Sequence, residues 1–297
     1  MGIEPGIYHG IPLADYLQWN AVSNSRLGLA ARSAAHYKQG FSGETSPALR
    51  LGSLVHCGTL EPLQLSNRYV VMPDFASMIE NVDAKGNRSY SPATTFVKEA
   101  KRQFEAANHR KQIVTQAEYD RMVGVATSLA QDPAICGLLR SGHSEVSLAW
   151  VDEDTGLDCK CRIDWLSIAL SSVRIVDVKT TRDGLRFESA IADYGYHRQL
   201  AFYRRGIDAV LGRESETWLI AAEAASPFCV RTAKVSEEAL RIGEQEVGDL
   251  LSLVAECKAT NAWPGYSNPC EWSLPAWKMR QSETEIELDW SGIDESV

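Results

Sequence analysis

The sequence predicts an α/β protein with a central mixed β-sheet flanked by helices and an added helical layer at its N-terminal end. Three observations lead to this prediction. Helix-start signals dominate roughly the first 140 residues. Three segments rich in β-branched residues then follow in close succession, which favours neighbouring strands. Beyond them come a helical stripe, two more strand-like segments and a long helix, as in sheets covered by helices.

The helices of the N-terminal part are predicted from their caps. Ser23 is a suitable N-cap for a helix over 24–31. Ser46-Pro47 places a cap and an N1 proline before a helix over 48–60. The other elements expected in this part are a strand over 68–72, a loop over 83–93, and helices over 95–108 and 116–130.

The later elements are predicted from periodicity. The strands are expected over 145–151, 159–167, 174–180, 217–222 and 228–233, and the helices over 196–211 and 237–258. In the strand over 174–180 the apolar residues Ile175, Val176 and Val178 occupy both faces, which indicates a central strand. We expect one domain over 1–280, mostly helical over 1–140 and with the sheet core over 141–280, before an acidic flexible tail over 281–297.

The composition, 44% hydrophobic and 23% charged over 297 residues, is typical of a globular protein. No apolar run is long enough for a membrane span, and the first residues lack a secretory pattern, so we expect a cytoplasmic protein without membrane contact. The seven cysteines form no CxxC pair and no zinc spacing. They are expected to be free, mostly buried thiols, which argues against a zinc site and against an iron–sulfur cluster.

The chemically most informative segment is the predicted strand over 174–180. Asp177 and Lys179 point to the same face because side chains alternate along a strand. A carboxylate and an ammonium in a buried strand are costly unless something compensates them, and a bound divalent cation and a phosphate could do so. A structural ion pair at a strand end is the alternative reading of this strand taken alone.

The preceding strand strengthens the chemical reading. Asp164 lies thirteen residues before Asp177 and shares a face with Arg162, a spacing that suits two paired strands joined by a short turn. Two carboxylates beside a lysine suit phosphodiester hydrolysis with Mg²⁺, which prefers oxygen ligands and activates a bound water. Lys179 could orient that water or stabilise the developing negative charge.

These residues resemble a known family. Asp164 followed by Asp177-Val178-Lys179 resembles the PD-(D/E)XK nuclease motif, and the surrounding RIDWL and IVDVKTT are similar to its RecB and RecE branches. His56, four residues after Gly52, matches the helical GxxxH motif, and Gln199 with Tyr203 matches QxxxY. Residues 22–27 resemble the start of RecE-type (exonuclease VIII) phage exonucleases related to lambda exonuclease, although Ser33-Ala34 stands where that family has Ser-Pro. Together the motifs span about residues 8 to 275 and are far more specific than the DxK triplet alone.

The resemblance implies a restriction-endonuclease-like core and a set of site residues. The metal ligands would be His56, Asp164, Asp177 and the carbonyl of Val178. The catalytic residues would be Lys179, Asp177, Asp164, Gln199 and Tyr203. The cofactor would be Mg²⁺, with two ions per site and Mn²⁺ as a substitute.

The resemblance also implies an activity: 5′→3′ exonucleolytic digestion of double-stranded DNA ends, leaving 3′ single strands for phage-type recombination. The implied partners are a single-strand annealing protein of the RecT/Bet type and further copies of the chain in a ring, as a trimer or alternatively a tetramer. The net charge of −9 is unusual for a DNA enzyme and favours an enclosed DNA path over an open basic face.

Contacts to DNA are less specified by the sequence. Ser25 stands near a helix start, where related enzymes place a hydroxyl by the 5′-phosphate, and Arg162 shares a strand face with Asp164. The other candidates for contacting DNA are Arg182, Arg186 and Arg198. Each of them could instead simply lie on the solvated surface. Two rival functions stay open: a PD-(D/E)XK endonuclease or CRISPR-adaptation-type nuclease, and a non-catalytic DNA-binding protein with a degenerate nuclease fold.

Overall fold

The computed structural model describes residues 3–41, 43, 46–75, 77, 81–82, 88–89, 95–266, 273–274 and 279–280. The chain divides into two compact units, Met1–Trp263 and Pro264–Val297, and the fold described below is that of the first. The tail expected over 281–297 lies outside the described residues. Most of the loop expected over 83–93 also lies outside the described residues. Within it, the short strand β4 (Arg88–Ser89) is described and pairs antiparallel with β3 (Asn81–Val82).

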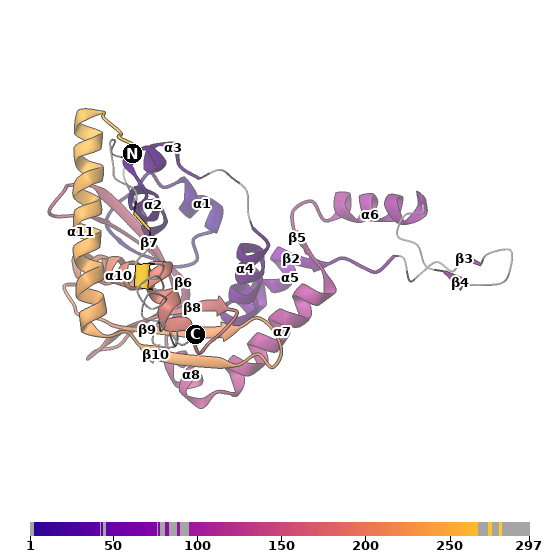
Figure 1. Ribbon diagram of the computed structural model, residues 1–297. Helices are drawn as coiled ribbons and strands as arrows, with labels where there is room; N and C mark the ends of the chain where they lie inside the picture. Colours follow the sequence, from indigo (N-terminus) through magenta and orange to yellow (C-terminus); the bar gives the residue numbers. More distant parts are fainter. Residues whose placement is uncertain are drawn as a thin grey trace, which may run out of the picture. The chain divides into compact units, whose positions relative to one another are not determined.

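A six-stranded mixed sheet forms the centre of the first unit, with strand order β1-β6-β7-β8-β9-β10. Its strands are β1 (Gly6–Tyr8), β6 (His143–Val151), β7 (Asp158–Ile168), β8 (Val173–Thr181), β9 (Glu216–Glu223) and β10 (Val230–Lys234). All neighbours pair antiparallel except β8 and β9, which are parallel. The predicted mixed sheet is confirmed, with the predicted strand over 174–180 near its middle (Figure 1).

The two central strands separate at one end. A short turn, closed by a hydrogen bond from Ala169 N to Ser172 O, joins β7 to β8. Their pairing runs from that turn only as far as Trp165 opposite Val176, whereas β8 stays paired with β9 as far as Thr181. The last third of β8 therefore has a backbone edge that side chains can reach.

Helices cover both faces of the sheet and fill two hydrophobic clusters. On one face, α10 (Tyr196–Leu211), α11 (Glu237–Thr260) and α2 (Asn24–Ala30) pack against residues such as Ile175. On the other face, α4 (Pro47–Leu60), α7 (Gln116–Gln131) and α8 (Pro133–Leu138) enclose Val176 and Val178 (Figure 1). Since β8 contributes to both clusters, it is a central strand, as its apolar pattern predicts.

The N-terminal layer begins with α1 (Leu13–Gln18), α2 and α3 (Ala34–Gln39). The predicted caps are present: Ser23 accepts the Arg26 N–H at the start of α2, and Ser46 accepts the Leu49 N–H at the start of α4. The remaining elements of this region are η1 (Pro62–Gln64), α5 (Leu65–Arg68), β2 (Tyr69–Val71), α6 (Thr95–Ala107) and β5 (Gln112–Val114), with β2 and β5 forming a parallel pair.

Two expectations from composition can be compared with the described residues. Six described cysteines are free, and four of them, Cys57, Cys159, Cys161 and Cys257, are buried. Among the helices that the structure describes, none combines the length and apolar character that a membrane crossing needs.

Candidate active site

The site forms where β7 and β8 separate. Beyond Trp165 and Val176, the same antiparallel register would place Asp164 opposite Asp177. The strands do not continue their backbone pairing there. Instead, Asp164 Oδ2 accepts a hydrogen bond from the backbone N–H of Val178 at 2.8 Å. The aspartate thus satisfies the exposed edge of β8 and is itself fixed in place.

One part of the site, which we term the strand-end group, consists of Asp177, Lys179, Gln199 and Tyr203. Asp177 Oδ2 lies 2.6 Å from Lys179 Nζ, an ion-pair contact that lacks ideal hydrogen-bond angles. Gln199, on α10, donates to Asp177 Oδ1 at 3.1 Å and to the Tyr203 hydroxyl at 2.7 Å. The Gln199 amide therefore finds polar partners on an otherwise apolar helix face.

Electrostatics hold the Lys179 side chain in its charged form. Burial lowers the pKa of Lys179, but Asp177 and Asp164 raise it by more, and the net shift is upward. Burial also raises the pKa of the Tyr203 hydroxyl well above its ordinary value, an effect that the neighbouring aspartates reinforce. In the metal-free chain the group therefore presents an ammonium and a neutral phenol, both of which can donate hydrogen bonds.

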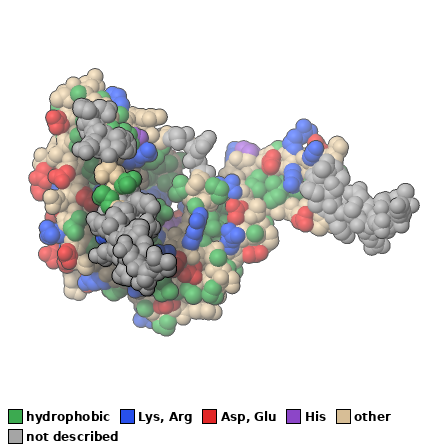
Figure 2. Space-filling view, in the orientation of Figure 1, with side chains coloured by type: hydrophobic (Ala, Val, Ile, Leu, Met, Phe, Trp, Pro, Cys, Tyr) green, Lys and Arg blue, Asp and Glu red, His purple; other side chains and the backbone are tan. Residues whose placement is uncertain are grey.

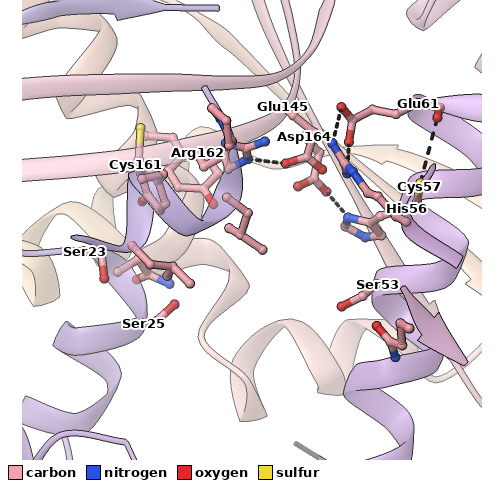
Figure 3. A pocket seen from close by; sticks show the side chains of 18 of the residues that line it. Ser23, Ser25, Ser53, His56, Cys57, Glu61, Glu145, Cys161, Arg162 and Asp164 are labelled. Carbon is pink, nitrogen blue, oxygen red and sulfur yellow. Dashed lines mark hydrogen bonds and ion pairs between the residues drawn. The ribbon is translucent and has the colours of Figure 1, made fainter. Parts of the chain in front are cut away.

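The other part, the cavity group, consists of His56, Glu145, Asp164 and Arg162. One ligand atom from each of His56, Glu145 and Asp164 lies within 4.8 Å of the others. His56 comes from α4, whereas Glu145 and Asp164 come from the adjacent strands β6 and β7 (Figure 3). Residues from a helix and two strands, far apart in sequence, thus converge on one point.

His56 is held by the edge of β8. Its Nε2 atom lies 2.6 Å from the carbonyl oxygen of Val178, and its Nδ1 atom lies 3.6 Å from Asp164 Oδ2. A carbonyl only accepts hydrogen bonds, so we assign the ring proton to Nε2. Nδ1 faces the Asp164 carboxylate, and either a proton on Nδ1 or a cation between the two atoms would stabilise this arrangement.

The raised pKa of Asp164 also indicates that a positive charge beside this carboxylate would be stabilising. Burial raises its pKa to about 7, and the negative charge of Asp177 adds to the shift, while His56 opposes it. Two carboxylates in a poorly hydrated site repel each other unless protons or cations intervene.

Glu145 was not among the residues that the sequence predicts for this site. Its carboxylate pairs with Arg162 Nε at 2.5 Å, and its backbone has a φ of 53°, an uncommon conformation for glutamate. Residues 144 and 146 pair with 165 and 163, which sets Glu145 beside Asp164. Only the register between β6 and β7 reveals this neighbour, and the sequence by itself does not fix that register.

The cavity group faces a cavity of about 580 Å³. Besides that group, the described wall residues include Tyr203, Ser23 and Ser25, with Arg68 from α5 on the side of His56. Figure 3 shows Ser23 and Ser25 across the cavity from His56 and Asp164. The strand-end residues Asp177, Lys179 and Gln199 are not part of the described cavity wall, so the two groups differ in their access to the cavity.

The predicted DNA-contacting residues fall at different depths. Ser25 is exposed on the cavity wall, and Arg162 is held there by Glu145 and by the carbonyl oxygen of Ile11. Arg182 and Arg186 are exposed between β8 and α9 (Phe187–Asp193). Arg198, largely buried, lies 3.5 Å from Glu246 of α11. As DNA contacts, all five remain predictions.

Acidic side chains are concentrated on the long helix α11. In Figure 2, Asp and Glu side chains gather along the margin that α11 occupies in Figure 1. The exposed acids of this helix are Glu237, Glu238, Glu244, Asp249 and Glu256. Part of the negative net charge is thus carried by α11. This helix covers one face of the sheet, whereas α4, which bears His56, covers the other face.

The donor set fits a divalent metal ion. Carboxylate oxygens with one imidazole suit Mg²⁺ or Mn²⁺, which prefer oxygen ligands and accept histidine to different degrees. The approach of His56 Nδ1 to the Asp164 carboxylate and the raised pKa of Asp164 both indicate a place where positive charge is favourable. His56, Glu145 and Asp164 would hold such an ion. Asp177, predicted as a ligand, instead faces Lys179 and Gln199.

Comparison with known proteins gives a family and a fold. A family model described as "PDDEXK-like domain of unknown function (DUF3799)" matches residues 23–274. A crystal structure titled as that of a "putative exonuclease" from Eubacterium rectale is similar over 96% of this chain and 100% of its own, with a TM-score of 0.55 and 14% identity. The structure of a protein named SSO0001 aligns over 52% of this chain and 68% of its own, with 12% identity and a TM-score of only 0.27. No curated protein sequence matches significantly.

Proposed function

The chain belongs to the family of PDDEXK-like domains, and on that premise we propose that it is a divalent-metal-dependent deoxyribonuclease. One observation carries the proposal: ligand atoms of His56, Glu145 and Asp164 converge within 4.8 Å beside the Asp177–Lys179 pair. A degenerate, non-catalytic copy of the fold would have no need to keep a lysine paired with one buried aspartate and a histidine beside a second buried aspartate.

The side chains divide the chemistry between them. When bound, a divalent cation supplies Lewis acidity: it lowers the pKa of a coordinated water and neutralises charge on the phosphate. Asp164 and His56 would hold this cation, and Glu145 of β6 would be a third ligand. The ammonium of Lys179, kept charged by Asp177, donates a hydrogen bond to the phosphate or to the attacking water. Gln199 holds the Asp177 carboxylate in the orientation that Lys179 requires.

For the substrate, we propose double-stranded DNA ends, degraded 5′→3′ to leave 3′ single strands for recombination by strand annealing. The support is the RecE-like sequence around Asp164, Asp177 and Lys179, together with the cavity beside Ser25, which is large enough for a nucleotide end. Mg²⁺ as the ion, a ring-shaped homo-oligomer, an annealing protein as partner and a cytoplasmic location belong to the same proposal.

The proposal is tested by digesting linear duplexes labelled at either the 5′ or the 3′ end, with and without a 5′-phosphate, in Mg²⁺, in Mn²⁺ and in EDTA. We expect metal-dependent release of 5′-labelled nucleotides while the 3′-labelled strand persists as a shortening single strand. Asp177→Ala and Lys179→Ala should be inactive, and Asp249→Ala on α11 should match the wild type.

Other outcomes would redirect or end the proposal. Cleavage of a covalently closed circle would favour the endonuclease alternative, and release from the 3′ end would reverse the polarity. Binding of DNA without any metal-dependent cleavage, in a correctly folded preparation, would mean that the chain is not a nuclease.

A further inference from the structure

Three aromatic rings form a stack beside Lys179 that the proposed chemistry does not use. The rings of Phe187 and Tyr196 are 5.8 Å apart at an interplanar angle of 27°. The rings of Tyr196 and Tyr194 are 5.7 Å apart at 30°. The stack begins with the buried Phe187 and ends with Tyr194, which is 69% exposed. It thus presents an aromatic ring to solvent at one end.

The stack is connected to the strand-end group. The Lys179 ammonium lies 5.0 Å from the centre of the Tyr196 ring, within the range of a cation–π contact. Tyr196 begins α10, and Gln199 and Tyr203 follow on the same face of that helix. One helix face therefore carries the ring next to Lys179 and the amide that holds Asp177.

The backbone around Tyr194 is well fixed. Tyr194 N donates to Ala190 O at 3.0 Å and closes the C-terminal end of α9. Gly195 then adopts a φ of 65° and turns the chain directly into α10. This left-handed conformation favours glycine at position 195. The exposed ring is consequently held on a helix–helix junction rather than on a long loop.

We propose that Tyr194 is a stacking platform for a nucleobase of single-stranded nucleic acid close to the reacting phosphate. This inference rests on the proposed nuclease function. Exposed aromatic rings bind single strands because every base has a π-face, and one such contact typically contributes about tenfold or more in affinity. The rings beneath Tyr194 restrict its motion, so little conformational freedom is lost when a base stacks on it.

The distances place this platform near the chemistry. Lys179, Tyr196 and Tyr194 are separated by successive steps of 5.0 and 5.7 Å. Bases of one DNA strand rise by about 3.4 Å each, so a base on Tyr194 would lie within about three nucleotides of the phosphate beside Lys179. Arg182 and Arg186 are exposed on the segment between β8 and α9 and could neutralise phosphates of the same strand.

The inference is tested with the full chain in EDTA, where no metal-dependent cleavage occurs. Binding of a fluorescein-labelled single-stranded oligonucleotide is followed by anisotropy for the wild type, Tyr194→Ala, Tyr194→Phe and Tyr194→Trp. We expect Tyr194→Ala to bind about tenfold more weakly and the two aromatic variants to bind like the wild type. Leu185→Ala, at an apolar residue outside the stack that is even more exposed, is the control and should bind normally.

A second readout locates the contact directly. Irradiation of the wild type with an oligonucleotide containing 5-iodouracil should give a covalent adduct at Tyr194, identified by mass spectrometry of the peptides. The inference is overturned if Tyr194→Ala binds as tightly as the wild type, or if the adducts lie elsewhere. It is also overturned if Tyr194→Ala alters the oligomeric state and leaves binding unchanged, because Tyr194 would then belong to a protein interface.

The outcomes also separate this inference from the proposed function. If the wild type degrades DNA and Tyr194→Ala binds and degrades it normally, the nuclease function stands and the stacking platform is refuted. If the wild type neither cleaves nor binds DNA, both the nuclease function and the stacking platform are refuted.

Discussion

The two halves of the site differ in how closely their functional side chains contact one another. In the strand-end group, Asp177, Lys179, Gln199 and Tyr203 contact one another at 2.6 to 3.1 Å. In the cavity group, Glu145 pairs with Arg162 at 2.5 Å, but His56 and Asp164 approach only to 3.6 Å at the wall of a cavity. The difference teaches that the first group is preorganised by contacts within the chain, whereas the second leaves room between His56 and Asp164 for the cation proposed above.

The largest expected effect comes from removing the charge in the preorganised group. Asp177→Asn keeps the shape of the side chain but leaves Lys179 without its ion-pair partner. We expect metal-dependent cleavage to fall by about 10³-fold, the scale of losing a key electrostatic contact in a buried site. Initial rates on end-labelled duplex measure this. Cleavage within tenfold of the wild type would show that Asp177 has only a structural role.

A second substitution probes the incomplete group. Glu145→Gln keeps a hydrogen-bond acceptor for Arg162 but removes one negative charge from the three-residue cluster. We expect Mg²⁺ or Mn²⁺ affinity to fall by about 10- to 100-fold, with activity partly restored at high metal concentration. Isothermal titration calorimetry and metal-dependent rates give both values. An unchanged metal affinity would exclude Glu145 as a ligand.

A third substitution tests whether the two groups have separate roles. Gln199→Leu removes both amide hydrogen bonds while filling a similar volume. We expect kcat to fall by about tenfold, because Asp177 and Lys179 lose their orientation, while metal affinity stays the same. Comparable losses in kcat and in metal affinity would contradict the division into two groups.

The smallest expected effect is a dependence of stability on pH. The pKa of Asp164 is raised from 3.8 to about 7 by burial and by Asp177, so the folded chain holds a proton there that the unfolded chain releases. In the metal-free protein the free energy of unfolding therefore falls as pH rises through this window. Asp164→Asn, which can still accept the Val178 N–H, lacks this loss.

Thermal denaturation in EDTA checks the sign. Relative to the wild type, the Tm of Asp164→Asn should increase as pH rises from about 4 to about 7 and then level off. A Tm difference that is the same at every pH would mean that Asp164 titrates normally in the folded chain.

The sequence predicts most of the fold because the long elements carry strong periodic patterns. The predicted helix over 196–211 coincides with α10, and the predicted strand over 174–180 differs from β8 by one residue at each end. Short elements were missed. They include β1, β5, α1, α3, α5, α8 and α9, each of seven residues or fewer. Such segments are too short for periodicity to separate them from turns.

The site was predictable where the relevant neighbours are local. Strand alternation brings Asp177 and Lys179 together, and helix spacing does the same for Gln199 and Tyr203. Glu145 could not be inferred because its place depends on the register of β6 against β7 and on a left-handed backbone. Tyr194 was also missed, since only the turn at Gly195 brings its ring onto Tyr196.

The left-handed backbone of Glu145 has a consequence for how this fold can change. A residue with a Cβ costs about 1–2 kcal/mol in that conformation, and glycine avoids the cost. Glu145→Gly should therefore give a chain that unfolds at higher temperature than Glu145→Ala although both lack the carboxylate. If Glu145 binds the proposed ion, stability and metal binding compete at this single position, and a variant that no longer binds the ion would gain stability there by one substitution.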